Sequence, residues 1–191
     1  MLPLVVERTS HTPARHPVAE RVGMAAVSGV AWAGLAWQEG ITLRLAALLA
    51  FAAAGVALSV VDLREKRIPN AILLAAAPVV LALSVADAGV TGRWDAVLWA
   101  LLGAVGLFAI YLGLALLAPS GIGMGDVKLA ALIGFVLGGA GWGTWLLGFS
   151  AGVLIGGLAA AITLLARRRG PSGTLPYGPA MVLGTLVALL L

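Results

Sequence analysis

Two aspartates stand where apolar stretches of the chain meet short polar loops. Asp62 directly follows an apolar run that ends in Ser59-Val60-Val61, and Asp126 follows three alternating glycines in Gly121-Ile122-Gly123-Met124-Gly125. A carboxylate at a membrane edge is costly unless it is paired or used. Two such groups close together cannot both ionise easily, so one keeps a proton. The ionised group can draw a proton from water while the protonated one donates to a carbonyl oxygen, which is the chemistry of amide hydrolysis without a covalent intermediate.

The composition determines which solvent the elements that carry these acids must face. The chain has 191 residues, of which 61% are hydrophobic and only 10% are charged. A soluble surface needs far more charge, so most of the surface must face lipid. A helical span takes about 20 apolar residues, and the runs lack the alternation of a membrane barrel. The sequence therefore predicts an all-α, polytopic transmembrane bundle of six or seven spans in one domain.

The apolar runs give the expected helices. Residues 1–21 form a polar leader, and residues 22–191 form a single transmembrane domain. The expected helices are Val22–Trp37, Leu45–Val61, Ala71–Ala86, Ala96–Ala118, Val127–Gly138, Gly143–Ala166 and Tyr177–Leu191. The fifth is too short to cross a bilayer unaided and should continue toward Trp142. Small residues at Gly148, Gly152 and Gly156, and at Ala180, Gly184 and Ala188, predict close helix packing in the last two spans.

The charged residues give the orientation. With a cytosolic N-terminus, all of the 12 Lys and Arg residues except Arg44 and Arg93 fall on the inner side, as the positive-inside rule requires. This predicts a multi-pass membrane protein with its N-terminus in the cytosol. Two spans separate Asp62 from Asp126, so both should face the cytosol. The basic residues would meet anionic lipids, and their division among short loops argues against nucleic acid as a partner.

Each acid also has a purely structural interpretation. Asp62 can be an interfacial acid neutralised by Arg64 or Lys66, while the nearby Glu65 is a solvated ion-pair partner. Asp126 can be a helix N-cap after a glycine loop. A phosphate loop is disfavoured, because no Gly-Lys-Ser/Thr follows the glycines. We favour the interpretation that the two aspartates act as a pair over a structural role for each alone. Neither aspartate is assigned as the proton donor or the proton acceptor, because coupled groups titrate as a unit.

No metal site or cofactor is predicted. Cysteine is absent from the chain, which excludes disulfides, thiol nucleophiles and zinc sites built on cysteine. The two histidines, His11 and His16, lie in the polar leader between prolines and fit a solvated tail better than a metal pair.

Three segments resemble the type IV prepilin peptidases, in the family's order. They are Asp62-Leu63-Arg64-Glu65-Lys66-Arg67-Ile68-Pro69-Asn70, Gly123-Met124-Gly125-Asp126-Val127-Lys128-Leu129, and Leu175-Pro176-Tyr177-Gly178-Pro179-Ala180. The second contains the Gly-x-Gly-Asp signature of intramembrane aspartic peptidases. The third is similar to the family's Pro-Phe-Gly-Pro segment, with Tyr177 in place of phenylalanine.

The resemblance implies an endopeptidase that removes the basic leader of prepilins or pseudopilins at the cytosolic membrane face, in type IV pilus assembly or protein secretion. It implies that Asp62 and Asp126 are catalytic. A second group of residues would bind substrate or shape loops: Gly123, Gly125, Lys128, Pro176, Gly178 and Pro179. Lys128 would partly neutralise Asp126 or meet lipid headgroups, Pro69 would fix the entry to the third helix, and Asn70 would cap it.

One departure from the family concerns methylation. Many members carry a cytosolic insert with four cysteines and also methylate the new N-terminus. This chain has no cysteine, so the prediction is a peptidase without N-methyltransferase activity, similar to the short members that serve tight-adherence pili or related secretion systems. Two other functions fit the paired acids: a small proton-coupled transporter, and a catalytically inactive assembly factor of the same fold.

Overall fold

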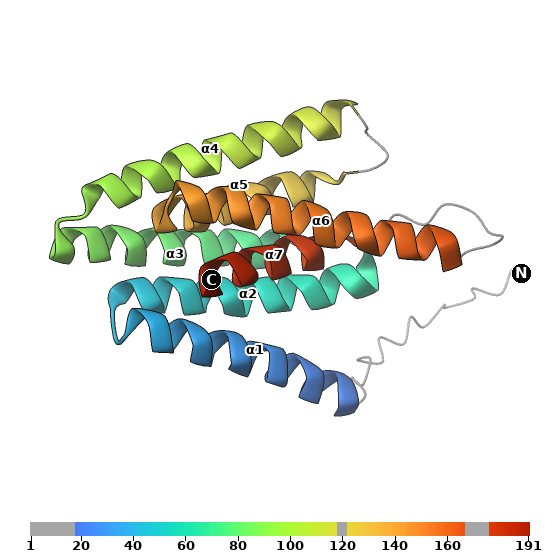
Figure 1. Ribbon diagram of the computed structural model, residues 1–191, viewed down its shortest axis with the longest axis horizontal. Helices are drawn as coiled ribbons and strands as arrows, with labels where there is room; N and C mark the ends of the chain where they lie inside the picture. Colours follow the sequence, from blue (N-terminus) through green and yellow to red (C-terminus); the bar gives the residue numbers. More distant parts are fainter. Residues whose placement is uncertain (1–17, 118–121, 167–175) are drawn as a thin grey trace, which may run out of the picture.

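The chain folds into antiparallel helices. The structure, a computed structural model, describes residues 18–117, 122–166 and 176–191. Every regular element in these ranges is a helix, as Figure 1 shows, and the prediction of an all-α bundle is confirmed. The helices are α1 (Val18–Glu39), α2 (Leu43–Glu65), α3 (Asn70–Thr91), α4 (Trp94–Leu117), α5 (Met124–Ala140), α6 (Trp142–Ala166) and α7 (Gly178–Leu190).

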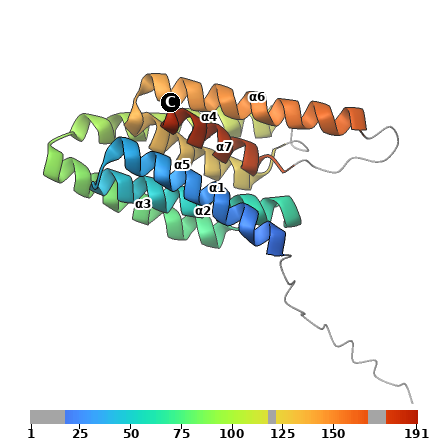
Figure 2. The ribbon, with the colours of Figure 1, turned by 60° about the horizontal axis from the view of Figure 1, so that its bottom comes forward.

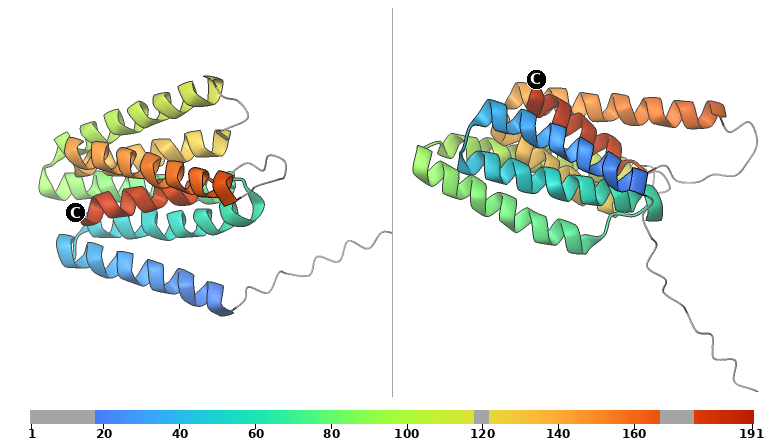
Figure 3. Two further views of the ribbon diagram at one scale, coloured as in Figure 1. Left: turned by 45° about the vertical axis from the view of Figure 1, so that its right-hand side comes forward. Right: turned by 90° about the horizontal axis from the view of Figure 1, so that it is seen from below.

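Successive helices reverse direction, and this brings three helix ends together. α2, α4 and α6 run toward one end of the bundle, which is on the right in Figure 1, and α3, α5 and α7 run back from it. The last turn of α2 and the first turns of α5 and α7 therefore lie at the same end. The views in Figures 2 and 3 show α1 at the margin of the bundle, against α2 and α7.

Among the residues that the structure describes, four helices are long and apolar enough to cross a bilayer. They are α2, α3, α4 and the Trp142–Thr163 part of α6. Large apolar side chains such as Leu74, Val105 and Leu154 are mostly exposed on the outside of the bundle. An aqueous solvent would penalise such a surface, so we conclude that this is an integral membrane protein.

α5 is the short helix that the sequence predicted, and its position explains its length. It extends from Met124 to Ala140, three residues earlier and two residues later than the predicted run. All seven residues from Leu132 to Gly138 are buried. A helix that is apolar on every side belongs in an interior. Because its neighbours cover its middle, α5 does not need the length of a helix that faces lipid on its own.

Glycines allow two pairs of helices to approach at backbone distance. In the α4–α5 pair, a Cβ on Gly103 would collide with the carbonyl oxygen of Gly134, and a Cβ on Gly138 would collide with that of Trp99. In the α6–α7 pair, a Cβ on Gly184 would lie 2.6 Å from the Cα of Gly152. The predicted close packing of the last two spans is confirmed, while the α4–α5 contact was not predicted.

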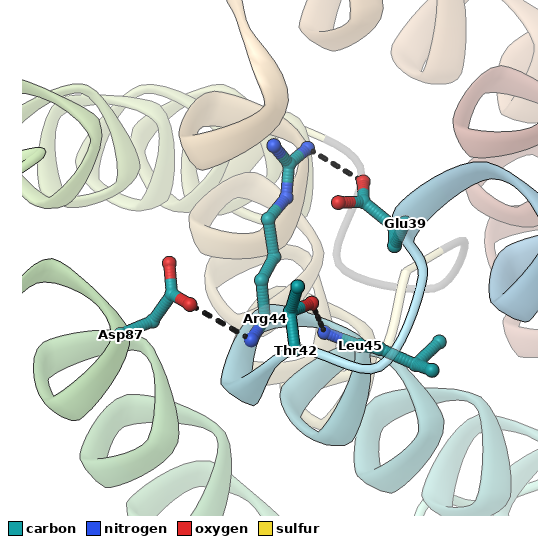
Figure 4. Close-up of polar contacts among 5 residues, drawn as sticks. All are labelled: Glu39, Thr42, Arg44, Leu45 and Asp87. Atoms are coloured by element: carbon teal, nitrogen blue, oxygen red, sulfur yellow. Dashed lines mark hydrogen bonds and ion pairs between the residues drawn. The ribbon is translucent and has the colours of Figure 1, made fainter. Parts of the chain in front are cut away.

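Polar bonds hold α1, α2 and α3 together at the end opposite Asp62 (Figure 4). Arg44 forms an ion pair with Glu39 at 3.2 Å. The Arg44 backbone N–H donates to the Asp87 carboxylate at 3.1 Å, and the Leu45 N–H donates to the Thr42 hydroxyl at 3.0 Å. These bonds satisfy N–H groups that the first turn of α2 cannot satisfy itself.

The predicted leader lies largely beyond the region that the structure describes. Residues 1–17, with His11 and His16, are outside the described residues, as are residues 167–175 with Arg167, Arg168 and Arg169. α1 begins at Val18, four residues before the predicted start of the membrane domain.

The α6–α7 packing gives a first prediction. Gly184→Ala should destabilise the protein by about 1–3 kcal/mol, because the new methyl group meets the backbone of Gly152, which cannot rotate away. Thermal unfolding in detergent would measure this loss. Gly157→Ala is the matched control: nothing lies within 4 Å of its Cβ position, so its unfolding should stay close to that of the parent. Equal effects of the two substitutions would contradict the packing argument.

Candidate active site

Asp62 lies near the C-terminal end of α2, and its side chain is buried. Only 4% of its surface is exposed. The helix ends at Glu65 and is capped by Lys66, which adopts the left-handed conformation with φ 53° and donates its backbone N–H to the Asp62 carbonyl at 2.8 Å. The interpretation of Asp62 as an interfacial acid neutralised by Arg64 or Lys66 stays a prediction, and the structure adds that the residue is buried.

The Asp62 carboxylate is bound by the start of α7. Its Oδ2 accepts a hydrogen bond from the backbone N–H of Gly178 at 2.9 Å, across 116 residues of sequence. Gly178 is the first residue of α7, so this N–H has no partner within its own helix. A helix N-terminus also favours negative charge. The bond therefore fixes Asp62 against the end of α7.

Asp126 lies in the first turn of α5. The N-cap position belongs to Gly123, so the interpretation of Asp126 as an N-cap is wrong in position. The acid still serves the helix start, because its Oδ2 accepts the Gly123 N–H at 3.1 Å. Its side chain is only partly buried, and its charge interacts with that of Asp62. The two predicted acids therefore come from remote segments to one end of the bundle and within electrostatic range of each other.

Ile68, in the loop between α2 and α3, packs against the starts of α5 and α7. A Cβ on Gly125 would lie 2.8 Å from the Ile68 Cβ. A Cβ on Gly178 would lie 2.9 Å from the Asp62 Oδ2 and 3.4 Å from the Ile68 Cδ1. The absence of side chains at these two glycines thus allows α5 and α7 to close around the loop between α2 and α3.

The expectation that Lys128 partly neutralises Asp126 or meets lipid headgroups stays a prediction, whereas the one for the cap of α3 is wrong in detail. Asn70 does not cap α3, because the N-cap is Pro69. The Asn70 side chain instead accepts a hydrogen bond from the Lys128 amino group at 2.9 Å. The prediction for Glu65 is confirmed, since its exposed carboxylate pairs with Arg67 at 3.3 Å.

The remaining predicted residues lie at the start of α7. Pro176 and Pro179 flank Tyr177 and Gly178, both prolines are partly buried, and Pro179 occupies the first turn of the helix, where a proline is favourable. Sequence reasoning missed Tyr111 of α4, a buried residue whose ring centroid is 6.1 Å from that of Tyr177. A polar tip inside an apolar span was its only signal in the sequence.

The site offers no cluster of metal ligands among the described residues. No group of three or more His, Asp or Glu side chains within them is placed to hold a metal ion. The chemistry available from the described side chains is proton transfer between water, a carbonyl oxygen and the two carboxyl groups.

Comparison with known proteins gives the chain's relatives. Residues 49–161 match the model of the type IV leader peptidase family, a range that contains Asp62 and Asp126. A prepilin leader peptidase/N-methyltransferase of Bacillus subtilis is 32% identical over 86% of this chain and 63% of its own length. A protein of the same description from Pseudomonas putida is 33% identical over 92% of this chain and 58% of its own length.

The match has a clear limit in length. The chain spans about three fifths of the curated relatives it matches, and this holds also for the Pseudomonas aeruginosa protein, which is 29% identical over 58% of its length. No solved structure matches the chain significantly.

The contact at Gly178 gives a second prediction. Gly178→Ala should lower the free energy of unfolding by about 1–3 kcal/mol, because its methyl group would press on the buried Asp62 carboxylate. Gly123→Ala is the control next to the other acid: its Cβ would lie at an ordinary 3.4 Å from the Asp126 Oδ2. Thermal unfolding in detergent would compare the two, and a Gly178→Ala protein as stable as the control would argue against the Gly178–Asp62 contact.

Proposed function

The chain belongs to the type IV leader peptidase family, and we propose that it is an aspartic endopeptidase that cleaves the leader of prepilin-like proteins. The observation that carries the proposal is the arrangement of Asp62 and Asp126. They come from different helices, lie at one end of the bundle, and are close enough for their charges to interact. The relatives named as prepilin leader peptidases support the choice of substrate.

The two carboxyl groups would work as a pair that shares one proton. The ionised member takes a proton from a water molecule held between them, and that water attacks the peptide carbonyl. The protonated member donates to the carbonyl oxygen, and the proton taken from water later goes to the leaving amine. The pair titrates as a unit, so the roles of acid and base belong to the dyad.

The surroundings of the dyad support this role. The hydrogen bond that Asp62 receives comes from a backbone N–H, and its side chain is buried, which restricts its rotation. A general acid or base has to be held in a fixed orientation toward the reacting atoms. Asp126 is less buried, which leaves one side of the dyad open to a substrate. Gly123, Gly125, Pro176, Gly178 and Pro179 would shape the backbone around that opening, and Lys128 would hold α5 to the start of α3 beside it.

The proposed activity is peptidase activity alone. The relatives are named for two activities, leader peptidase and N-methyltransferase. The second is associated with a four-cysteine segment in the family, and this chain contains no cysteine. A product with an unmodified N-terminus is therefore the expected result of cleavage.

A co-expression experiment tests the dyad. Asp62→Asn and Asp126→Asn should each reduce cleavage of a prepilin from the same genome by at least about 100-fold, because each removes a group that must exchange a proton. Mass spectrometry of the pilin would show the uncut precursor with either variant, and the trimmed, unmethylated protein with the parent enzyme. Chelators should leave the activity unchanged.

Glu65→Gln provides the matched control. Glu65 lies three residues from Asp62, yet it is exposed and its carboxylate pairs with Arg67. The control should cleave as the parent does. Full cleavage by either aspartate variant, or an equal loss in the control, would overturn the assignment of the dyad.

We propose further that the protein lies in the cytoplasmic membrane with its N-terminus and the dyad on the cytosolic side. Because the chain has no cysteine, a single introduced cysteine reports on one position. Glu65→Cys and Asp95→Cys both replace exposed acids outside the apolar segments. In intact cells a membrane-impermeant maleimide should label Asp95→Cys, and it should label Glu65→Cys only after permeabilisation. The reverse pattern would contradict the proposed orientation.

A further inference from the structure

Tyr111 is a buried tyrosine of α4 that faces α6 and the segment before α7. Its side chain is 3% exposed. Its ring meets Phe149 of α6 edge-on, with centroids 6.5 Å apart, and lies 6.1 Å from the ring of Tyr177. Phenylalanine would fill such a position without a polar atom to satisfy. A buried tyrosine hydroxyl needs a partner, which makes its presence inside an apolar bundle informative.

The hydroxyl of Tyr111 finds its partner at the site. The rings of Tyr111 and Tyr177 lie 6.1 Å apart, and the Tyr111 hydroxyl is placed to interact with the side chain of Tyr177 and, more weakly, with the charge of Asp126. Tyr111 is thus a residue of α4 that contacts the segment before α7 and is sensitive to the acid at the start of α5. It therefore lies beside the segment whose Gly178 N–H binds Asp62, and within range of the charge of Asp126.

Tyr177 is held from its other side by α6. A Cβ on Gly156 would collide with the Tyr177 ring, so the glycine leaves the space that the ring occupies. The residue after Tyr177 is Gly178, whose N–H binds the Asp62 Oδ2 at 2.9 Å. One dipeptide therefore carries both the aromatic ring that faces Tyr111 and the N–H that orients Asp62.

We propose that Tyr111 is a positioning residue for the aspartate dyad: through its contact with Tyr177 it holds the Gly178 N–H on Asp62 while Asp126 stays in register beside it. The proposal rests on the proposed peptidase function. Tyr111 acts through Tyr177 and Gly178, and it touches no reacting atom. A small displacement of Gly178 would turn the Asp62 carboxylate, and hydrolysis is sensitive to that orientation.

The hydroxyl pair is also where this chain departs from the segment that it resembles. The family's Pro-Phe-Gly-Pro segment has phenylalanine where this chain has Tyr177. In this chain the extra hydroxyl is placed to interact with that of Tyr111. We therefore expect the two tyrosines to act as one unit, in which loss of either hydroxyl removes the whole contact.

The experiment is a double-mutant cycle on prepilin cleavage with purified protein. Tyr111→Phe and Tyr177→Phe remove only the hydroxyls and keep both rings. Each should lower kcat about three- to tenfold, the effect of one lost hydrogen bond, with KM within about twofold. The double variant should be no slower than the slower single variant. A loss in kcat equal to the product of the single losses, or unchanged kcat in Tyr111→Phe, would overturn the proposal.

Thr185→Val is the matched control, because it also removes a fully buried hydroxyl. That hydroxyl donates to the Met181 carbonyl within α7 at 2.8 Å. Its kcat should stay within about twofold of the parent. A comparable loss in this control would mean that any missing buried hydroxyl slows the enzyme, and would overturn a specific role for Tyr111.

The outcomes separate this proposal from the proposed function. If Asp62→Asn and Asp126→Asn are inactive while the tyrosine variants match the parent, the dyad stands and the role of Tyr111 is wrong. If the aspartate variants remain active, the peptidase mechanism itself is wrong. Should the parent cleave no tested prepilin, the same cycle measured by thermal unfolding decides the contact: fully additive shifts in the unfolding temperature contradict coupling of the two hydroxyls, and sub-additive shifts support it.

Discussion

The hydrogen bond from the Gly178 N–H to the Asp62 carboxylate is the interaction on which the site depends. Asp62 is buried in the last turn of α2, which ends three residues later at Glu65. An acid in such a place is expensive unless a polar group meets it. The first N–H of α7 supplies that group, and the donor is neutral, so the carboxyl group is satisfied without being locked into an ion pair by this contact. Such a carboxyl group can still exchange a proton.

This bond exists only because the helices can approach closely. α7 reaches Asp62 by lying on α6, where Gly152 and Gly184 meet backbone to backbone, and by lying beside Ile68, where Gly178 has no side chain. α5 brings Asp126 to the same end through its own close contact with α4 at Gly103 and Gly134. Within a bilayer, helix association depends on van der Waals packing between small residues. The small residues therefore determine the geometry of the two acids.

The sequence predicted the parts of this arrangement that rest on local pattern. Apolar run length gave all seven helices of the described residues, and the largest shift is the end of α3, which lies at Thr91, five residues beyond the predicted Ala86. Counting spans placed Asp62 and Asp126 at one end.

The Gly178–Asp62 bond was beyond prediction, because a backbone N–H leaves no signature in the sequence and its partner is 116 residues away. The role of Asn70 was predicted wrongly for a related reason. Helix-capping rules consider only a residue's own helix, whereas the Asn70 side chain forms a hydrogen bond with Lys128 of another helix. The Gly134–Gly138 spacing in α5 was visible, and it carries the α4–α5 contact that was missed.

The opposite ends of the bundle place aspartates in different surroundings, which supports the proposed role of Asp126 and not one for Asp87. Asp87 and Asp126 both accept a backbone N–H near the start of a helix, at the same distance of 3.1 Å. Asp87 sits beside Arg44, whose guanidinium is in turn paired with Glu39, so charges of both signs alternate in a structural cluster. Asp126 instead lies within electrostatic range of a second buried acid and of a buried tyrosine hydroxyl. Acids that repel each other and share a proton are poor mechanical supports but effective proton donors and acceptors. The contrast arises from the groups that surround each carboxylate, and the fold determines which groups those are.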